Sequence, residues 1–231
     1  MITQLKQMIP VGTRSLLFGV HQVFIHPWVV AIAWIKLYGW PKEWQIWLAF
    51  LIHDWGYWGC QEMDGEDGEQ HPKFAANLMF KIVVDIEFFK LRSFRKPIAW
   101  IDASKASDKA QEWYEFCLYH SRHFAKQAGT KPSRLCVADK LATAVEPAWM
   151  YVPRAWITGE LAQYRQVHVN RISANGQIND SERALLLYGN HWQWKWALSN
   201  YLSRWALAHK EDQSDNWTPT KEEVRLKTEA E

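Results

Sequence analysis

The sequence is poor in cysteine and carries no large excess of charge of either sign. Cys60, Cys117 and Cys136 are widely spaced, odd in number and form no CxxC pair, which argues against a disulfide scaffold and for a reducing compartment. The formal net charge of +2 over 231 residues argues against a protein that wraps a polyanion, because such proteins carry a strongly basic face. We therefore expect a cytoplasmic protein whose partner is a small molecule rather than a nucleic acid.

Long apolar runs are also missing. The segment from Pro27 to Ile52 is rich in Trp, Ile, Val and Leu, but Lys36, Gly39 and the charged pair 42–43 interrupt it before the ~20 apolar residues that a bilayer span needs. The first residues contain no apolar stretch followed by a small-residue cleavage site, so no secretory signal is expected. These absences predict a protein without a membrane segment.

The sequence shows no alternating strand pattern and no internal repeat, whereas apolar residues recur at helical spacing through most of the chain. We therefore predict an all-α fold. Hydrophobic residues make up 48% of the sequence and include 16 tryptophans, so a sizeable core can form. Tryptophans at helical spacing, among them Trp44, Trp47, Trp192 and Trp196, are interpreted as core residues.

The stretch Leu51-Ile52-His53-Asp54-Trp55-Gly56 places a histidine–aspartate pair at the end of an apolar helix. Burying an unpaired carboxylate costs several kcal/mol, so Asp54 needs a partner. His26 and His71 each precede a proline that suits the first turn of a helix. Because the positive end of the helix dipole disfavours imidazolium, both rings should stay neutral and available to a metal.

The helix that starts at Pro27 ends at Gly39 and the next opens at Pro41, so the two should pack antiparallel and bring His26 next to His53. Later in the chain, His120 and Asp139 fall on apolar stripes, where a polar residue needs a specific partner. We therefore interpret six side chains as the ligands of a dinuclear metal site: His26, His53, Asp54, His71, His120 and Asp139. Imidazole with carboxylate suits Fe, Mn, Co or Zn, and Mg less well.

This ordered set of ligands resembles the HD-domain superfamily of metal-dependent phosphohydrolases. Residues 51–56 (LIHDWG) resemble the family's LLHDIG run and residues 137–141 (VADKL) resemble its ADKL, so the resemblance spans roughly residues 14–146. His71-Pro72 also resembles the HP of the cyclic-dinucleotide phosphodiesterase branch, but the GYP motif of that branch is absent, and that substrate is not supported. A lysine often follows the family's HD-x-G, whereas Tyr57-Trp58 stand here.

The resemblance implies that one divalent metal is held by His26, His53, Asp54 and Asp139, and that Asp54 bridges to a second metal completed by His71 and His120. A hydroxide held between the two cations would attack phosphorus in a phosphate ester of a nucleotide or a similar small molecule. His123, three residues after His120, is expected to protonate the leaving oxygen or to replace His120 as ligand. The expected catalytic residues are therefore Asp54, His123 and Lys140.

The phosphate of such a substrate needs cationic partners. The candidates near the ligands are Arg14, Lys73, Arg122, Lys126 and Lys140. Lys140 and Arg122 are favoured because they adjoin proposed ligands, although a solvated surface charge is the simpler interpretation of any single one. Trp55 and Trp58, just past the ligand pair, are expected to line the substrate pocket.

We expect a single HD-type helical domain over residues 1–209, with a metal-binding core at about 14–146 and a helical extension at 147–209, followed by a charged, disordered tail at 210–231. Other functions stay open. Di-iron oxygenases of the same fold use the same six ligands to activate dioxygen, and an HD-like domain can bind a nucleotide without catalysis. The basic segment 90–109 also leaves a nuclease open, which the near-neutral charge weakens.

Overall fold

The computed structural model describes residues 9–63, 66–93, 103–166 and 178–211. All regular elements in these ranges are helices, which confirms the predicted all-α class. They are α2 (Val11–Phe18), α3 (His26–Tyr38), α4 (Trp44–Ile52), the 3-10 helix η1 (Trp55–Tyr57), α5 (Glu66–Glu69), α6 (Pro72–Ser93), α7 (Ala103–Leu118), α8 (Arg122–Gln127), α9 (Arg134–Val145), α10 (Ala148–Thr158), α12 (Asp180–Tyr188) and α13 (His191–His209). Residues 160–166 form a further helical segment after the turn at Gly159.

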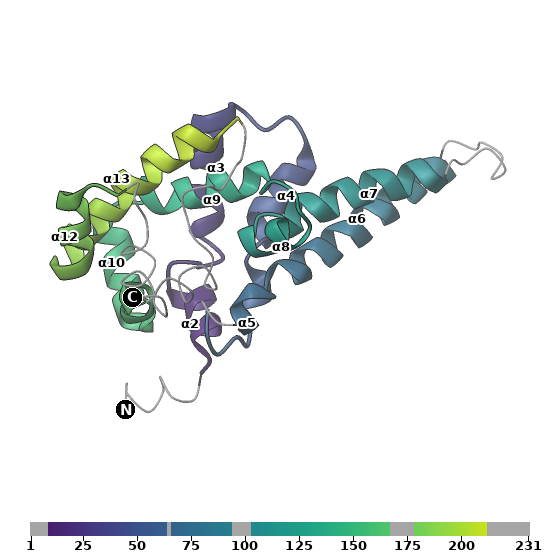
Figure 1. The fold of residues 1–231 in the computed structure, drawn as a ribbon. Coiled ribbons are helices and arrows are strands. Elements are labelled where there is room, and N and C mark those ends of the chain that lie inside the picture. The colour runs from purple at the N-terminus through teal and green to yellow at the C-terminus, as the bar shows by residue number, and fades with distance from the viewer. Residues whose placement is uncertain (1–8, 64–65, 94–102, 167–177, 212–231) are drawn as a thin grey trace.

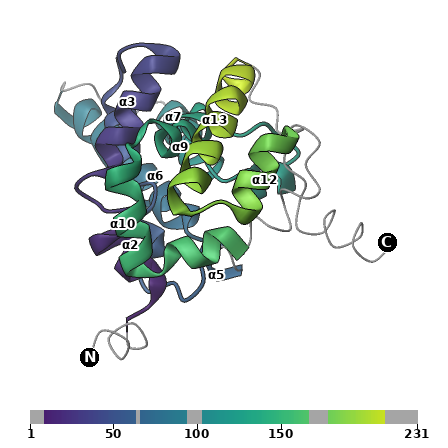
Figure 2. The same ribbon diagram turned by 90° about the vertical axis from the view of Figure 1, so that its left-hand side faces the viewer.

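The helices form a body with one projecting hairpin. In the body, α9 packs against both α3 and α13, while α12 and α10 pack on α13 and α10 also contacts α2 (Figure 2). Helices α6 and α7 lie side by side and project from this body (Figure 1). The start of α6 and the end of α7 therefore lie at the base of the hairpin, where α6 contacts α4 and η1.

Helix α3 follows the predicted pattern closely. Pro27 occupies its first turn, where a missing N–H does no harm, and the helix ends at Gly39, whose φ of 79° is one that other residues rarely adopt. Val30, Ala33 and Trp34 are among the residues of one face that are buried in the core. This packing fixes the start of α3, and with it the position of the His26 backbone.

Several tryptophans expected in the core lie on the surface instead. Trp44, Trp192 and Trp196 are 39%, 51% and 58% exposed, so their prediction as core residues was wrong, and Trp47 is only partly buried. Trp192 and Trp196 are four positions apart and share an exposed face of α13, whereas Trp194 lies on another face and is fully buried. Periodicity alone therefore did not reveal which face of α13 packs inward.

A buried lysine ties α13 to the end of α9. The ammonium group of Lys195 donates to the carbonyl oxygens of Thr143 (2.7 Å) and Glu146 (3.0 Å) and to the hydroxyl of Ser199 (2.8 Å). Carbonyls at a helix C-terminus lack partners within the helix and favour a nearby cation. Burial lowers the pKa of Lys195 to about 8. The contact stabilises the end of the helix that carries Asp139.

In the part of the chain that the structure describes, no helix combines the length and the apolar character needed to cross a bilayer. The predicted tail at 210–231 falls almost entirely outside the described residues, which end at 211. Its disorder and the boundaries of the domain stay predictions.

Candidate metal centre

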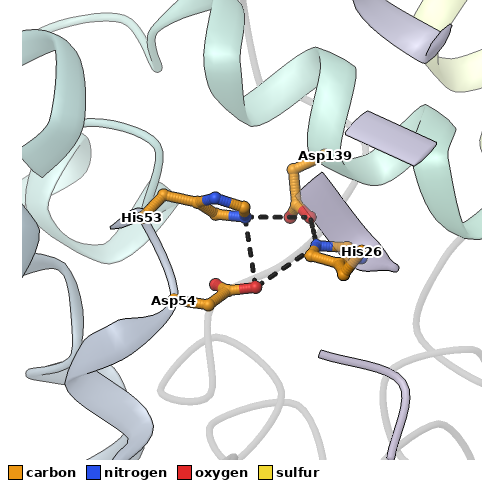
Figure 3. Close-up of side chains that lie close together, drawn as sticks. All are labelled: His26, His53, Asp54 and Asp139. Carbon is orange, nitrogen blue, oxygen red and sulfur yellow. Dashed lines mark hydrogen bonds and ion pairs between the residues drawn. The ribbon is translucent and has the colours of Figure 1, made fainter. Parts of the chain in front are cut away.

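Four of the predicted ligands converge from α3, the end of α4 and the middle of α9 (Figure 3). Nε2 of His26 lies 3.2 Å from Oδ2 of Asp54 and 3.2 Å from Oδ1 of Asp139. Nε2 of His53 lies 3.1 Å from the same Oδ2 of Asp54. The expected meeting of His26 and His53 is confirmed, since their ring centroids are 5.3 Å apart. We call His26, His53, Asp54 and Asp139 the first group; each offers a ligand atom, and these atoms lie within 4.8 Å of one another.

Asp54 also faces a second group. Its other oxygen, Oδ1, lies 3.8 Å from Nε2 of His71 and 3.9 Å from Nε2 of His120, and those two nitrogens are 3.0 Å apart. His71 precedes α6 and His120 follows α7, so both stand at the base of the hairpin. Asp54, His71 and His120 again offer ligand atoms within 4.8 Å of one another. Asp54 therefore presents one carboxylate oxygen to each group.

Three of the histidines are oriented by the same local hydrogen bond. Nδ1 of His53, of His71 and of His120 pairs with the backbone carbonyl three positions earlier in the chain. Because a carbonyl oxygen only accepts, Nδ1 carries the hydrogen and donates it. A neutral ring then has its lone pair on Nε2, the atom that faces the cluster. Metal-binding imidazoles in proteins are commonly oriented by such a bond from the other ring nitrogen.

This orientation leaves lone pairs facing one another, which fits a cation. Nε2 of His71 and Nε2 of His120, 3.0 Å apart, cannot hydrogen-bond to each other when neither carries a proton. Nε2 of His53 and Oδ2 of Asp54 are buried and lie 3.1 Å apart, but they make no well-aligned hydrogen bond, and with a neutral His53 both atoms would be acceptors without a donor. A divalent cation in each group would satisfy these atoms, so the residues fit two metal ions.

The cluster shifts the pKa values of its histidines in opposite directions. Burial by itself lowers the pKa of His53, but Asp54 and Asp139 outweigh burial and raise this pKa to about 10. The same carboxylates raise the pKa of His26 against the effect of burial. For His71, burial and the neighbouring imidazole of His120 lower the pKa to about 3. Without a metal, His26 and His53 of the first group therefore favour the protonated form, and a binding cation would displace those protons, whereas His71 stays neutral.

The remaining members of the cluster follow the same logic. Burial and the nearby His53 lower the pKa of His120 to about 4. Burial alone would raise the pKa of Asp54, but His53 and other imidazoles hold it well below 3.8. Lys140 and the histidines do the same for Asp139, again against the effect of burial. Both carboxylates are therefore ionised and able to bind a cation at neutral pH.

We expect the metal-free protein to be most stable near pH 6.5. His26 and His53 have raised pKa values, so their stabilisation is complete below the unfolded value of 6.5 and is lost as the pH rises through the folded values, which for His53 is about 10. His71 and His120 have lowered pKa values, so the unfolded chain binds more protons than the folded one as the pH falls from 6.5 toward about 4 for His120 and about 3 for His71, which favours unfolding. Each pH unit between the folded and unfolded values corresponds to about 1.4 kcal/mol at most.

Urea unfolding at a series of pH values, with a chelator present, measures this profile as the free energy of unfolding. The variant His53→Gln should lose most of the decline on the alkaline side, because it removes the group whose pKa is raised to about 10. A wild-type free energy of unfolding that keeps rising above pH 6.5 would contradict the assignment.

Gly56 allows the start of α6 to lie against the turn that follows Asp54. A Cβ atom at position 56 would lie 2.0 Å from the carbonyl oxygen of His71 and 2.7 Å from its Cα. These are backbone atoms, which cannot rotate away as a flexible side chain can, so the position requires glycine. The glycine of the LIHDWG run therefore places His71 beside Asp54.

The expected catalytic residues outside the ligand set lie in different surroundings. Nζ of Lys140 lies 3.3 Å from Oδ2 of Asp139, at the edge of the first group. His123 belongs to α8 and its Nδ1 lies 3.4 Å from Oε2 of Glu69, so its ring pairs with that carboxylate rather than with the ligands. The roles of Lys140 and His123 in catalysis stay predictions.

The expected substrate-binding residues are spread more widely. Lys73 lies over the ring of Phe124, at 5.2 Å from its centroid, and the guanidinium of Arg14 lies near Gly159. Trp55 and Trp58, within and just after η1, are 38% and 65% exposed, while Arg122 and Lys126 belong to α8. Substrate binding by these six residues stays a prediction.

Sequence reasoning missed two residues beside the cluster and assigned no role to a third. The ring of His21 lies 5.4 Å from that of His26, and Nδ1 of His21 is 3.4 Å from the buried carboxylate of Glu160. Tyr57, noted only because the family often has a lysine there, stacks on His71 with ring centroids 3.9 Å apart. A second histidine five positions before His26 was the one available signal, since nothing in the sequence marks Glu160 as buried.

Comparison with known proteins gives no relative: no family model, no curated protein and no solved structure matches the chain. The fold and the site therefore define a class only: an all-helical protein in which a cluster of histidines and aspartates can hold metal ions.

Proposed function

We propose that the chain is a metal-dependent phosphohydrolase with an HD-domain-like fold, which cleaves a phosphate ester of a nucleotide or a similar small molecule. The six predicted ligands come from five separate places in the sequence and lie together in two groups. The observation that carries the proposal is the position of Asp54, whose two oxygens each face one group. A shared carboxylate of this kind suits a pair of cations that act on one phosphoryl group.

The first group consists of His26, His53, Asp54 and Asp139 and would hold one cation, while Asp54, His71 and His120 would hold the other. When bound, two such cations supply Lewis acidity toward phosphoryl oxygens and lower the pKa of a nucleophilic water. Their identity among Fe, Mn, Co, Zn and Mg is not fixed by the ligand atoms, although the four imidazoles favour the first four.

Other side chains of the site would act on the substrate directly. Lys140 carries a positive charge at the edge of the first group, with its side chain about one third exposed. A phosphate that enters there would exchange water for a charge-assisted hydrogen bond with this ammonium. Trp55 is partly exposed immediately after the ligand pair and offers an apolar surface to the rest of the substrate.

The test is a phosphate-release assay on protein stripped of metal and then supplied with each of the five metals in turn. We expect release from at least one class of nucleotide or small phosphate ester, with loss on chelation and recovery on addition of metal. Oxygen uptake is measured in parallel. Iron-dependent oxygen uptake without phosphate release would replace the proposal with the di-iron oxygenase, and bound metal with neither reaction would favour a binding domain.

A further inference from the structure

A buried carboxylate from the C-terminal part of the chain lies near the metal centre, with His21 between it and the ligand His26. Glu160 is fully buried, just after the turn that ends α10. It accepts hydrogen bonds from the hydroxyls of Ser15 (2.5 Å), Thr158 (2.5 Å) and Tyr164 (3.2 Å), and from the backbone N–H of Val20 (3.2 Å). Donors from α2, the following loop and the chain around Gly159 thus hold one carboxylate in a fixed place.

The loop between α2 and α3 is shaped around this carboxylate. A Cβ atom at Gly19 would lie 2.0 Å from Oε2 of Glu160, so the glycine lets the backbone approach closely enough for Val20 to donate. Nδ1 of His21 lies 2.8 Å from Oγ of Ser15 and 3.4 Å from Oε1 of Glu160. Because the hydroxyl hydrogen of Ser15 goes to Glu160, the oxygen of Ser15 accepts from His21. Ser15 and Glu160 together form an anchor that sets the orientation of the His21 ring.

From this anchor a chain of ring contacts leads to both groups of ligands. The ring of His21 meets that of His26 edge to face, with centroids 5.4 Å apart, and lies 5.1 Å from the ring of Tyr57. Tyr57 in turn stacks on His71, with centroids 3.9 Å apart and planes within 17°. His26 belongs to the first group and His71 to the second. Two residues that bind no metal themselves therefore contact one ligand ring in each group.

We propose that His21 and Tyr57 are positioning residues, which transmit the rigidity of the Ser15–Glu160 anchor to the ligand rings of His26 and His71. The inference rests on the metal binding of the proposed function, but not on hydrolysis. Residues that orient metal ligands typically contribute 10–100-fold to metal affinity. The chain after α9 would thus be part of the metal centre, although all six ligands precede it.

Titration of metal-stripped protein with Mn²⁺ in a calorimeter tests the inference through metal affinity. Tyr57→Leu removes the ring that stacks on His71, so we expect one of two binding events to weaken by roughly 10–100-fold. Tyr57→Phe keeps the ring and should stay within about 2-fold of wild type in both. The variant His120→Ala identifies which of the two events belongs to the second group.

Glu160→Gln tests the anchor itself, because an amide group cannot accept from all the donors that surround the carboxylate. We expect weaker binding of Mn²⁺, by roughly 10-fold. Glu182→Gln is the matched control: Glu182 is also buried and pairs with Arg204 at 2.6 Å, but it lies on α12, away from the ligands. It should lower the free energy of unfolding and leave both Mn²⁺ affinities unchanged.

The results separate this inference from the proposed function. Wild-type affinities in both Tyr57→Leu and Glu160→Gln, or equal losses in Glu160→Gln and Glu182→Gln, would overturn the positioning role. A wild-type protein that binds no Mn²⁺ would overturn both this inference and the proposed function. Two bound Mn²⁺ ions without phosphate release would overturn the proposed reaction alone, since the affinities of the variants still decide the role of His21 and Tyr57.

Discussion

Asp54→Ala is expected to abolish the binding of both cations and to reduce metal-dependent phosphate release to the level of the protein-free control. Asp54 is the one residue that belongs to both groups, with Oδ2 facing His26 and His53 and Oδ1 facing His71 and His120. Removal of a residue that orients a ligand lowers metal affinity by roughly 10–100-fold, and removal of a shared ligand itself should lower it by more. Metal content by elemental analysis and phosphate release are measured on the same sample.

Variants of the other ligands should lose one cation instead of two. Asp139→Ala removes a ligand of the first group only, and His120→Ala removes one of the second only, so each should retain one cation. Asp85→Ala is the matched control, since Asp85 is exposed on α6 and should retain both. Two bound cations or full activity in Asp54→Ala would be incompatible with the site described above.

Gly56→Ala is expected to remove the second cation while leaving the first. The added Cβ would meet the carbonyl oxygen, the carbonyl carbon and Cα of His71 at 2.0–2.7 Å, so the start of α6 must move away from Asp54. Displacement of a ligand backbone should weaken the second binding event by more than about 100-fold, the upper end of what loss of an orienting partner costs. Overpacking should also lower the free energy of unfolding by about 1–3 kcal/mol.

Gly59→Ala, three positions further along the chain, separates the loss of stability from the loss of the second cation. Gly59 has a φ of 82°, which costs a residue with a side chain about 1–2 kcal/mol, but its Cβ would meet nothing within 4 Å. This variant should lose stability and keep both cations. Calorimetric Mn²⁺ titration with urea unfolding compares the pair, and an unchanged second binding event in Gly56→Ala would show that the contact with His71 does not control the site.

The site could be predicted from the sequence to the extent that helical register and turn length determine it. A tight turn between two helices sufficed to expect His26 beside His53, and a polar residue on an apolar stripe sufficed to single out Asp139. His120 was assigned to the face of a helix, whereas the structure places it just after α7 ends at Leu118. Its position in the cluster did not depend on that detail, because the carbonyl of Cys117 orients its ring.

What could not be predicted depends on contacts between distant parts of the chain. His21 and Glu160 meet because α2 packs on α10, and no local sequence pattern predicts that these two helices pack together. The inward face of α13 was misjudged for a related reason, since Trp192, Trp194 and Trp196 are equally apolar and only their neighbours decide which is buried. His123, three positions after His120, lies in the separate helix α8, so sequence proximity did not place it among the ligands.

The projecting hairpin carries ligands of the second group, whereas the first group is carried by the body of the protein. His71 and His120 stand at the two feet of α6 and α7, whereas His26 and Asp139 belong to helices packed within the body. A sideways displacement of the hairpin as one unit would move His71 and His120 together relative to Asp54, while His26 and Asp139 stay with the body. If each group binds a cation as proposed, the cation held by Asp54, His71 and His120 is the one whose coordination would change when the hairpin is displaced.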